Sequence, residues 1–192
     1  ILMQFVFDAQ GERTLPGNNG FSVANMRLKL NGRLDRGLGY FFQTKFDKSP
    51  AILDAFMTYQ KSPALILRMG QFKTPFSREY LTSASEFDFV DRSRVVSALT
   101  PGRQIGVQAS GFLADDLISY SAAVTNGNGT GANGNDNGDF LYTGRVALFP
   151  NLRADDRGGT LEAGLNAAFS SDEDVTLAAG EIVDFSGERF AA

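Results

Sequence analysis

The chain of 192 residues contains no cysteine, no histidine and no tryptophan. Without cysteine it can form no disulfide, no thiolate nucleophile and no cysteine-based zinc site. Without histidine it lacks the commonest general base and the commonest metal ligand. Its 18 Lys and Arg residues are outnumbered by 22 Asp and Glu residues, for a net charge of −4. This balance argues against nucleic acid as a partner.

Long hydrophobic runs are also absent. No apolar stretch approaches the roughly 18 residues of a transmembrane helix, which excludes a helical membrane protein. The absence does not exclude a transmembrane β-barrel, because half of each strand in such a barrel is polar. No charged segment followed by an apolar one stands at the start, so we expect that any export signal has been removed or is not included.

The clearest pattern that is present covers residues 24–34, where polar and apolar residues alternate strictly. A period of two predicts a β-strand with two different environments. The length of the pattern matches the about 9–11 residues of a strand that crosses a bilayer, whereas strands in soluble proteins average about 5–6. We therefore expect one face to contact lipid and the other to face an aqueous lumen. The polar set is Asn25, Arg27, Lys29, Asn31 and Arg33, and the other set is Ala24, Met26, Leu28, Leu30, Gly32 and Leu34.

Similar alternation recurs along the rest of the chain, so we predict an all-β, antiparallel transmembrane β-barrel of about ten strands in one domain, 1–192. When the predicted strands are counted from the N-terminus, the connections after odd-numbered strands tend to be long and those after even-numbered strands tend to be tight, as in outer-membrane barrels. The short connection 48–51 and the long connection 150–159 are exceptions to this rule. In 52–60, the residues Leu53, Ala55, Met57 and Tyr59 share one face. The other predicted strands are 1–10, 38–47, 65–72, 103–113, 117–125, 140–149, 161–170 and a shortened 187–192.

Six motifs occur in an order that is specific to one family. Residues 70–77 read GQFKTPFS, and E-x-L-x-S at 79–83 and F-x-D-R at 89–92 follow. LDAF at 53–56 precedes them, and RQIGV at 103–107 and GRVALFP at 144–150 come after. Together they resemble the phosphate-selective porin O/P family, although Asp91 stands where that family usually has Glu.

The resemblance implies a trimeric porin of the Gram-negative outer membrane, with roughly sixteen strands per barrel. Because about ten strands are present, the chain resembles the N-terminal portion of a longer barrel, and a complete ten-stranded barrel is the alternative. The implied partners are the lipid bilayer of the outer membrane, small anionic solutes and two further copies in a homotrimer.

The long segment between residues 73 and 103 is the main candidate for function. In porins a long loop folds into the barrel and narrows the pore, and rings of Arg and Lys there select anions. Aromatic residues of the segment would anchor it to the wall. The alternative is an ordinary outer loop with solvated charges. The candidate constriction cations are Lys73, Arg78, Arg92, Arg94 and Arg103.

Cationic residues on the predicted lumen face would extend an anion-attracting path. The alternative is that these bases pair with acids across strands, namely with Asp8, Asp47, Asp54 or Glu162. The lumen-facing candidates are Arg27, Lys29, Arg33, Lys45, Arg68 and Arg145.

Two weaker motifs lie in the Asn/Gly-rich segment 126–139. Residues 129–134 match G-x-G-x-x-G, but a strand pattern follows where dinucleotide binding needs a helix. Asn133, Asn135 and Asn137 resemble part of a calcium loop without its closing Glu, so we favour a flexible surface loop. Several aromatic residues are candidates for an interfacial girdle or a trimer contact: Tyr40, Phe42, Phe46, Tyr59, Tyr120 and Tyr142.

The sequence therefore predicts a passive, water-filled outer-membrane channel for small solutes, with a bias toward anions such as phosphate. We expect no catalytic residue, cofactor or metal. An outer-membrane barrel enzyme is one alternative, but without histidine it would need a Ser–Lys pair that nothing singles out. A structural or scaffolding barrel with a plugged lumen is the other.

Overall fold

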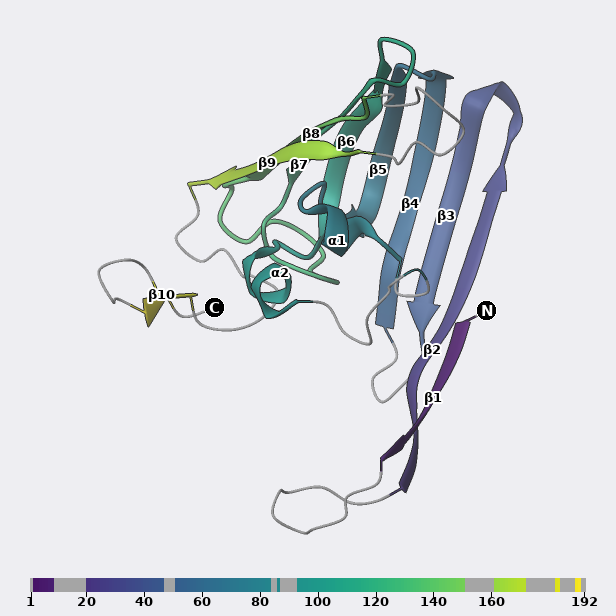
Figure 1. Cartoon of the computed structure of the whole chain (residues 1–192), viewed down its shortest axis with the longest axis vertical. Helices are drawn as coiled ribbons and strands as arrows, with labels where there is room; N and C mark the ends of the chain where they lie inside the picture. The colour runs from purple at the N-terminus through teal and green to yellow at the C-terminus, as the bar shows by residue number, and fades with distance from the viewer. Residues whose placement is uncertain are drawn as a thin grey trace.

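The computed structural model describes residues 2–8, 20–46, 51–83, 86, 93–150, 161–171, 182–183 and 189–190. Within it, nine strands form one antiparallel sheet in which each strand pairs with its neighbour in sequence (Figure 1). This up-and-down order confirms the predicted antiparallel arrangement, although the sheet is not closed. The strands are β1 (Leu2–Asp8), β2 (Gly20–Arg33), β3 (Leu38–Lys45), β4 (Ala51–Ser62), β5 (Leu65–Lys73), β6 (Arg103–Leu113), β7 (Ile118–Thr125), β8 (Leu141–Leu148) and β9 (Ala163–Ser170).

The predicted tenth strand of the sheet is the exception. Residues 187–192 contain β11 (Arg189–Phe190), which pairs with β10 (Ile182–Val183) in a separate two-stranded sheet. A pairing between segments so close in sequence closes a short loop and loses less chain entropy than a pairing with a distant strand. The large sheet therefore ends at β9.

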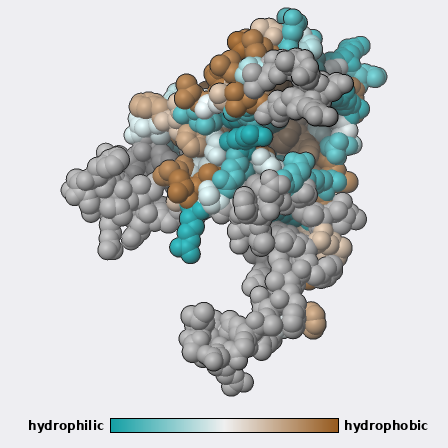
Figure 2. Space-filling view, in the orientation of Figure 1, coloured by the Kyte–Doolittle hydropathy of each residue, from teal (hydrophilic) through white to brown (hydrophobic). Residues whose placement is uncertain are grey.

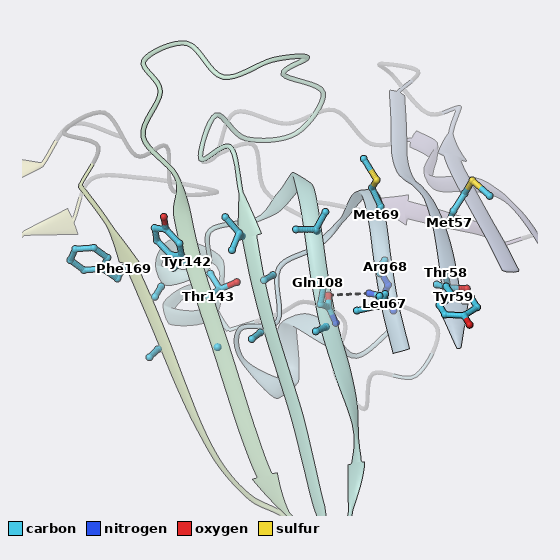
Figure 3. A pocket seen from close by; sticks show the side chains of 18 of the residues that line it. Met57, Thr58, Tyr59, Leu67, Arg68, Met69, Gln108, Tyr142, Thr143 and Phe169 are labelled. Carbon is cyan, nitrogen blue, oxygen red and sulfur yellow. Dashed lines mark hydrogen bonds between the residues drawn. The ribbon is translucent and has the colours of Figure 1, made fainter. Parts of the chain in front are cut away.

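The two faces of the sheet follow the alternation seen in the sequence. One row across β4 to β9 joins residues that lie opposite one another and are between 36% and 70% exposed: Met57, Met69, Val107, Val124, Tyr142 and Phe169. The adjacent row, which points to the other face, joins Thr58, Arg68, Gln108, Ala123 and Thr143 (Figure 3). We call the apolar side the outer face and the polar side the inner face.

A β-bulge in β4 changes one predicted assignment. Asp54 lies opposite Gln43 and Ile52 lies opposite Thr44, so the pairing skips Leu53. Leu53 is 8% exposed, whereas Ile52 is 50% exposed. The prediction that Leu53 shares the outer face with Ala55 is therefore wrong, because the extra residue of a bulge shifts the alternation by one position.

The segment between β5 and β6 contains two short helices, α1 (Arg78–Leu81) and α2 (Arg94–Leu99). Hydrogen bonds hold it against the inner face at both sides of the sheet. Lys29 Nζ of β2 lies 3.5 Å from Ser83 Oγ, and the Ser77 amide donates to Asn166 Oδ1 of β9 at 3.1 Å. Figure 1 shows both helices on one side of the curved sheet. No helix in the described part of the chain is long and apolar enough to cross a membrane.

The connections at the opposite end of the sheet are tight. Between β2 and β3, η1 (Asp35–Gly37) makes a single turn. Between β6 and β7, Ala114, Asp115 and Asp116 have φ angles of 53°, 51° and 66°. These left-handed conformations are uncommon outside glycine, and Asp adopts them more readily than most residues. They reverse the chain within a few residues, as the predicted tight turns require.

Candidate functional site

A cavity of about 290 Å³ lies on the inner face beneath α1. One carboxylate, that of Asp54, borders it among the described residues. Figure 2 shows hydrophilic residues gathered around α1 on this side of the molecule. The cavity combines cations predicted for the lumen with cations predicted for the constriction: Arg27 and Lys29 of β2, Arg68 and Lys73 of β5, and Arg103 of β6.

The Asp54 carboxylate is engaged by one guanidinium. Arg103 Nε lies 3.0 Å from Asp54 Oδ1, and Arg103 Nη2 lies 3.1 Å from Oδ2. Both side chains are largely buried, with 14% and 8% of their areas exposed. A bidentate pair of this kind fixes the orientation of both groups. Asp54 lies opposite Gln43 and alternates with the outer-face residue Ala55, so it points to the inner face, where this pairing is possible.

Arg68 lies at the centre of the inner face. It borders several cavities, among them those of about 290, 250 and 600 Å³. Its guanidinium carbon lies 4.4 Å from the ring centroid of Phe56 and 5.6 Å from that of Phe72. Its Nη1 donates to a neutral acceptor, Gln108 Oε1, at 3.4 Å (Figure 3). Its Nε is buried with no hydrogen-bond partner.

Lys73 connects the wall to α1. Its ammonium donates to the carbonyl oxygens of Tyr80 at 2.6 Å, Leu81 at 3.4 Å and Thr82 at 3.1 Å. It also lies 5.1 Å from the Tyr80 ring centroid. Carbonyls at the end of a helix lack partners within the helix, and a cation satisfies them. Lys73 therefore holds the segment in place while it adds charge to the inner wall.

A second ionic cluster lies around Glu162. Its Oε2 is 2.8 Å from Arg78 Nε, and its Oε1 accepts a hydrogen bond from Arg145 Nη2. Arg78 begins α1 and Arg145 lies in β8, so the carboxylate joins the inner segment to the wall. Arg145 thus has the alternative arrangement considered for the lumen-facing bases, in which a base pairs with an acid. Arg78 and Arg103, from the constriction candidates, pair with acids as well.

The remaining predicted cations lie farther from the first cavity. Arg33 borders the 600 Å³ cavity, which it shares with Arg68. Lys45 ends β3 opposite Arg27 and is half-buried. Arg94 begins α2 and is exposed. Arg92, Asp47 and the side chain of Asp8 lie outside the described residues.

Three phenylalanines on the inner face were missed by the sequence analysis. Phe41 and Phe56 stack with ring centroids 5.1 Å apart and planes 9° apart. The Phe72 ring stands nearly perpendicular to that of Phe56, at 6.4 Å and 88°. All three border the 290 Å³ cavity. The available signal was the pair Phe41-Phe42, in which an aromatic residue takes a position in the polar register.

Gly70 makes room for this aromatic cluster. It lies opposite Phe56 and has a φ of +129°, a conformation that favours glycine. A Cβ at this position would stand 2.3 Å from the Ala55 carbonyl oxygen. The bare backbone at Gly70 therefore lets β5 approach β4 closely beneath the Phe56 ring.

The Asn/Gly-rich segment 126–139 is tied to the wall by two buried glutamines. Gln104 accepts the Gly129 amide at 2.9 Å and donates to the Pro101 carbonyl at 2.9 Å. Gln71 accepts the Gly131 amide at 3.0 Å. The segment leads into β8 and not into a helix, so the G-x-G-x-x-G match has no dinucleotide-binding context. No group of three or more acids in the described ranges could hold a metal ion.

Comparison with known families gave one match. The family model described as phosphate-selective porin O and P matches residues 3–179. This range contains both ionic clusters, the segment between β5 and β6 and the whole of the large sheet except Leu2. Comparisons with curated proteins and with solved structures gave no match.

Proposed function

This chain belongs to the phosphate-selective porin O and P family, the outer-membrane porins of Gram-negative bacteria, and we propose that anions cross it along cationic side chains centred on Arg68. The family is one of channels, not of enzymes, and it does not support a scaffolding role. The observation that carries the proposal is the position of Arg68, which borders several cavities and whose guanidinium hydrogen-bonds a neutral glutamine.

The arrangement of charge around Arg68 supports attraction of anions. Five cations border the 290 Å³ cavity, and its one described carboxylate is shared with Arg103. Lys29 is exposed and contacts the neutral Ser83 hydroxyl. A narrow aqueous path lined by charge of one sign raises the local concentration of the opposite ion. Anions would exchange part of their hydration for these side chains.

The segment between β5 and β6 supplies the constriction in this proposal. Lys73, Glu162 and Asn166 hold it against the inner face at separate points. A segment fixed in this way reduces the cross-section of the lumen and keeps its cations near the permeating ion. Arg78 and Lys73 thus act mainly as anchors, and Arg68 and Lys29 face the path. Arg94 and Arg92 extend the positive potential in this proposal.

Closure of the barrel requires more strands than the described sheet contains. β1 pairs with β2 alone and β9 with β8 alone in the large sheet, which leaves two open edges. Lipid cannot satisfy the free N–H and C=O groups of such edges. We propose that the chain forms an N-terminal portion of one larger barrel domain whose additional strands cover both edges.

Substitution of Arg68 tests the path directly. Arg68→Gln removes one unit charge, and at about 4 Å in water such a charge contributes about 1 kcal/mol. We expect the anion-to-cation permeability ratio, measured from reversal potentials in a salt gradient across a planar bilayer, to fall about fivefold. Arg68→Lys, which retains the charge, should restore most of the ratio.

Lys61 provides the matched control, because it is an exposed cation at the end of β4 and does not border the cavities. Lys61→Gln should leave the reversal potential close to that of the parent channel. A parent channel that prefers cations, or an Arg68→Gln channel with unchanged selectivity, would refute the proposal.

A further inference from the structure

We propose that the preferred solutes of this channel are oxyanions that carry a small flat apolar group, as an aryl phosphate does, in place of bare inorganic phosphate. The inference rests on the proposed anion path and names the class of solute that this path takes. It is carried by the phenylalanines that share the cavity with the cations. A site for a fully hydrated inorganic ion has no use for exposed aromatic area.

The aromatic side chains form a continuous apolar wall beside the charges. Phe41 and Phe56 stack face to face, with ring centroids 5.1 Å apart, on neighbouring strands β3 and β4. Phe72 is fully buried behind them and acts as packing. Phe41 and Phe56 remain partly exposed toward the cavity. Their position differs from that of the outer-face aromatics, which lipid covers.

An apolar residue also faces the cavity from the opposite side. Leu81 ends α1, is 38% exposed and borders the same cavity. Lys73, which binds its carbonyl oxygen, fixes this end of the helix over the wall. A flat apolar group would therefore meet Leu81 on one side and the Phe41–Phe56 pair on the other.

The cations stand where the oxyanion of such a solute would lie. The guanidinium carbon of Arg68 is 4.4 Å from the ring centroid of Phe56. An oxyanion bound by Arg68 would therefore lie next to the aromatic wall. Lys29 and Arg103 border the same space. The cavity volume of about 290 Å³ is at the lower end of the about 300–1,000 Å³ of small-molecule sites, which suits a single aromatic ring.

Two phosphate probes, one with the ring and one without, test the inference at a pH above the second pKa of both, where each is a dianion. Phenyl phosphate and inorganic phosphate are added separately to the chloride current of the purified channel in a planar bilayer, and half-blocking concentrations are compared. An aromatic contact adds about 0.5–1.5 kcal/mol. We therefore expect phenyl phosphate to block at a concentration about fivefold lower than inorganic phosphate does. Equal block by both probes, or stronger block by inorganic phosphate, overturns the inference.

Adjacent phenylalanines on β3 provide a matched pair of variants. Phe41 faces the cavity, whereas Phe42 lies on the outer face opposite Leu30 and Ala55. Phe41→Leu should remove most of the preference for phenyl phosphate, and Phe42→Leu should retain it. A second variant, Leu81→Ser, alters an exposed helical residue and should weaken the same preference without disturbing the sheet. An equal loss in Phe41→Leu and Phe42→Leu contradicts the assignment.

The outcomes separate this inference from the proposed function. If the channel is anion-selective but both phosphates block it equally, the proposed anion path stands and the proposed aromatic contribution is refuted. A channel without anion selectivity loses the path itself, and the inference with it.

Discussion

Asp54 and Arg68 have different effects on the charge of the inner face. Asp54 lies on that face opposite Gln43 and neutralises part of the charge of Arg103. Arg68 is flanked by aromatic rings and hydrogen-bonds a neutral amide. Because opposite charges cancel over short distances, a guanidinium that forms no ion pair with a carboxylate of the described residues contributes more to the potential felt by a passing ion.

Removal of the Asp54 charge should therefore increase anion preference. Asp54→Asn retains an oxygen that can accept a hydrogen bond from Arg103 but leaves the buried guanidinium without a counter-ion. We expect a larger anion-to-cation permeability ratio together with a loss of about 3–5 kcal/mol in the free energy of unfolding, because a buried pair has been broken. Reversal potentials and urea titration of the folded channel in lipid vesicles measure the two effects.

Asp115→Asn is the control, because Asp115 is exposed in the turn between β6 and β7 and Asn tolerates its left-handed backbone. It should change neither quantity appreciably. A decrease in anion preference in Asp54→Asn would show that the carboxylate acts in some other way.

At the scale of elements, the segment between β5 and β6 depends on polar anchors. The helices within it have 4 and 6 residues, too few for stability on their own. Glu79 of α1 accepts the Ser93 amide at 2.5 Å and the Ser93 hydroxyl at 3.0 Å, and Ser93 in turn caps α2. α1 is thus stabilised by contacts with α2 and with the wall, and α2 by its contacts with α1.

Loss of the Lys73 ammonium should loosen this segment. Lys73→Met retains much of the side-chain volume but leaves three carbonyl groups at the end of α1 without their donor. We expect single-channel recordings to show several-fold more frequent current fluctuations, because the segment moves within the lumen. Lys61→Met is the matched control. A steady current in Lys73→Met would mean that Glu162 and Asn166 suffice to hold the segment.

The Asn/Gly-rich segment depends on Gln104 in a similar way. Gln104→Ala leaves the Gly129 amide and the Pro101 carbonyl without their partner, at a cost of about 1–3 kcal/mol for buried groups. Hydrogen exchange of a peptide that covers residues 126–139 should become faster. Gln60→Ala, at an exposed position of β4, should leave the exchange rate unchanged. Unchanged exchange in Gln104→Ala would show that Gln71 alone holds the segment.

At the scale of the whole molecule, the two faces of one sheet meet different solvents. The outer row from Met57 to Phe169 is apolar and exposed, as expected of a surface that hydrocarbon covers. Another outer row pairs Ala109, Ala122, Gly144 and Ala167. On the inner face the polar residues hydrogen-bond one another or border cavities. The membrane, and not a packed protein core, therefore stabilises the outer half of this fold.

A charge on the outer face should destabilise the folded channel. Val107→Arg places a cation in the hydrocarbon region, and such substitutions cost about 2–4 kcal/mol near the bilayer midplane. Urea titration of the channel in lipid vesicles should show this loss. Ser110→Arg, on the inner face of the same strand, should cost much less because water is within reach. Equal losses would indicate that Val107 does not face lipid.

The assembly expected from the family is a homotrimer, which we propose for this chain also. Trimer contacts would cover part of the outer face. Electrophoresis of the detergent-solubilised protein, without heating, should give a band of about three times the mass of the heated sample. A single monomer band under both conditions, supported by chemical cross-linking without dimers or trimers, would contradict the proposal.

The amino-acid sequence alone was enough to predict the strands and their two faces, since alternation is a local property that each strand carries by itself. Residues 24–34 and 103–113 needed no partner for this prediction, and the motif at 70–77 identified the family. The partners of charged residues needed the fold. Asp54 and Arg103 are 49 positions apart in the chain, and the pairing of β4, β5 and β6 brings them together.

Only the tertiary structure placed phenylalanines beside the cations of the inner face and brought α1 across to Glu162. These contacts depend on the register between strands and on the path of a long connection. Both are set by the sum of many weak pairings, none of which has a signature in a single stretch of sequence. The sequence thus determined the face of most strand residues, although a bulge in β4 shifts the alternation, and the fold determined which of those residues meet.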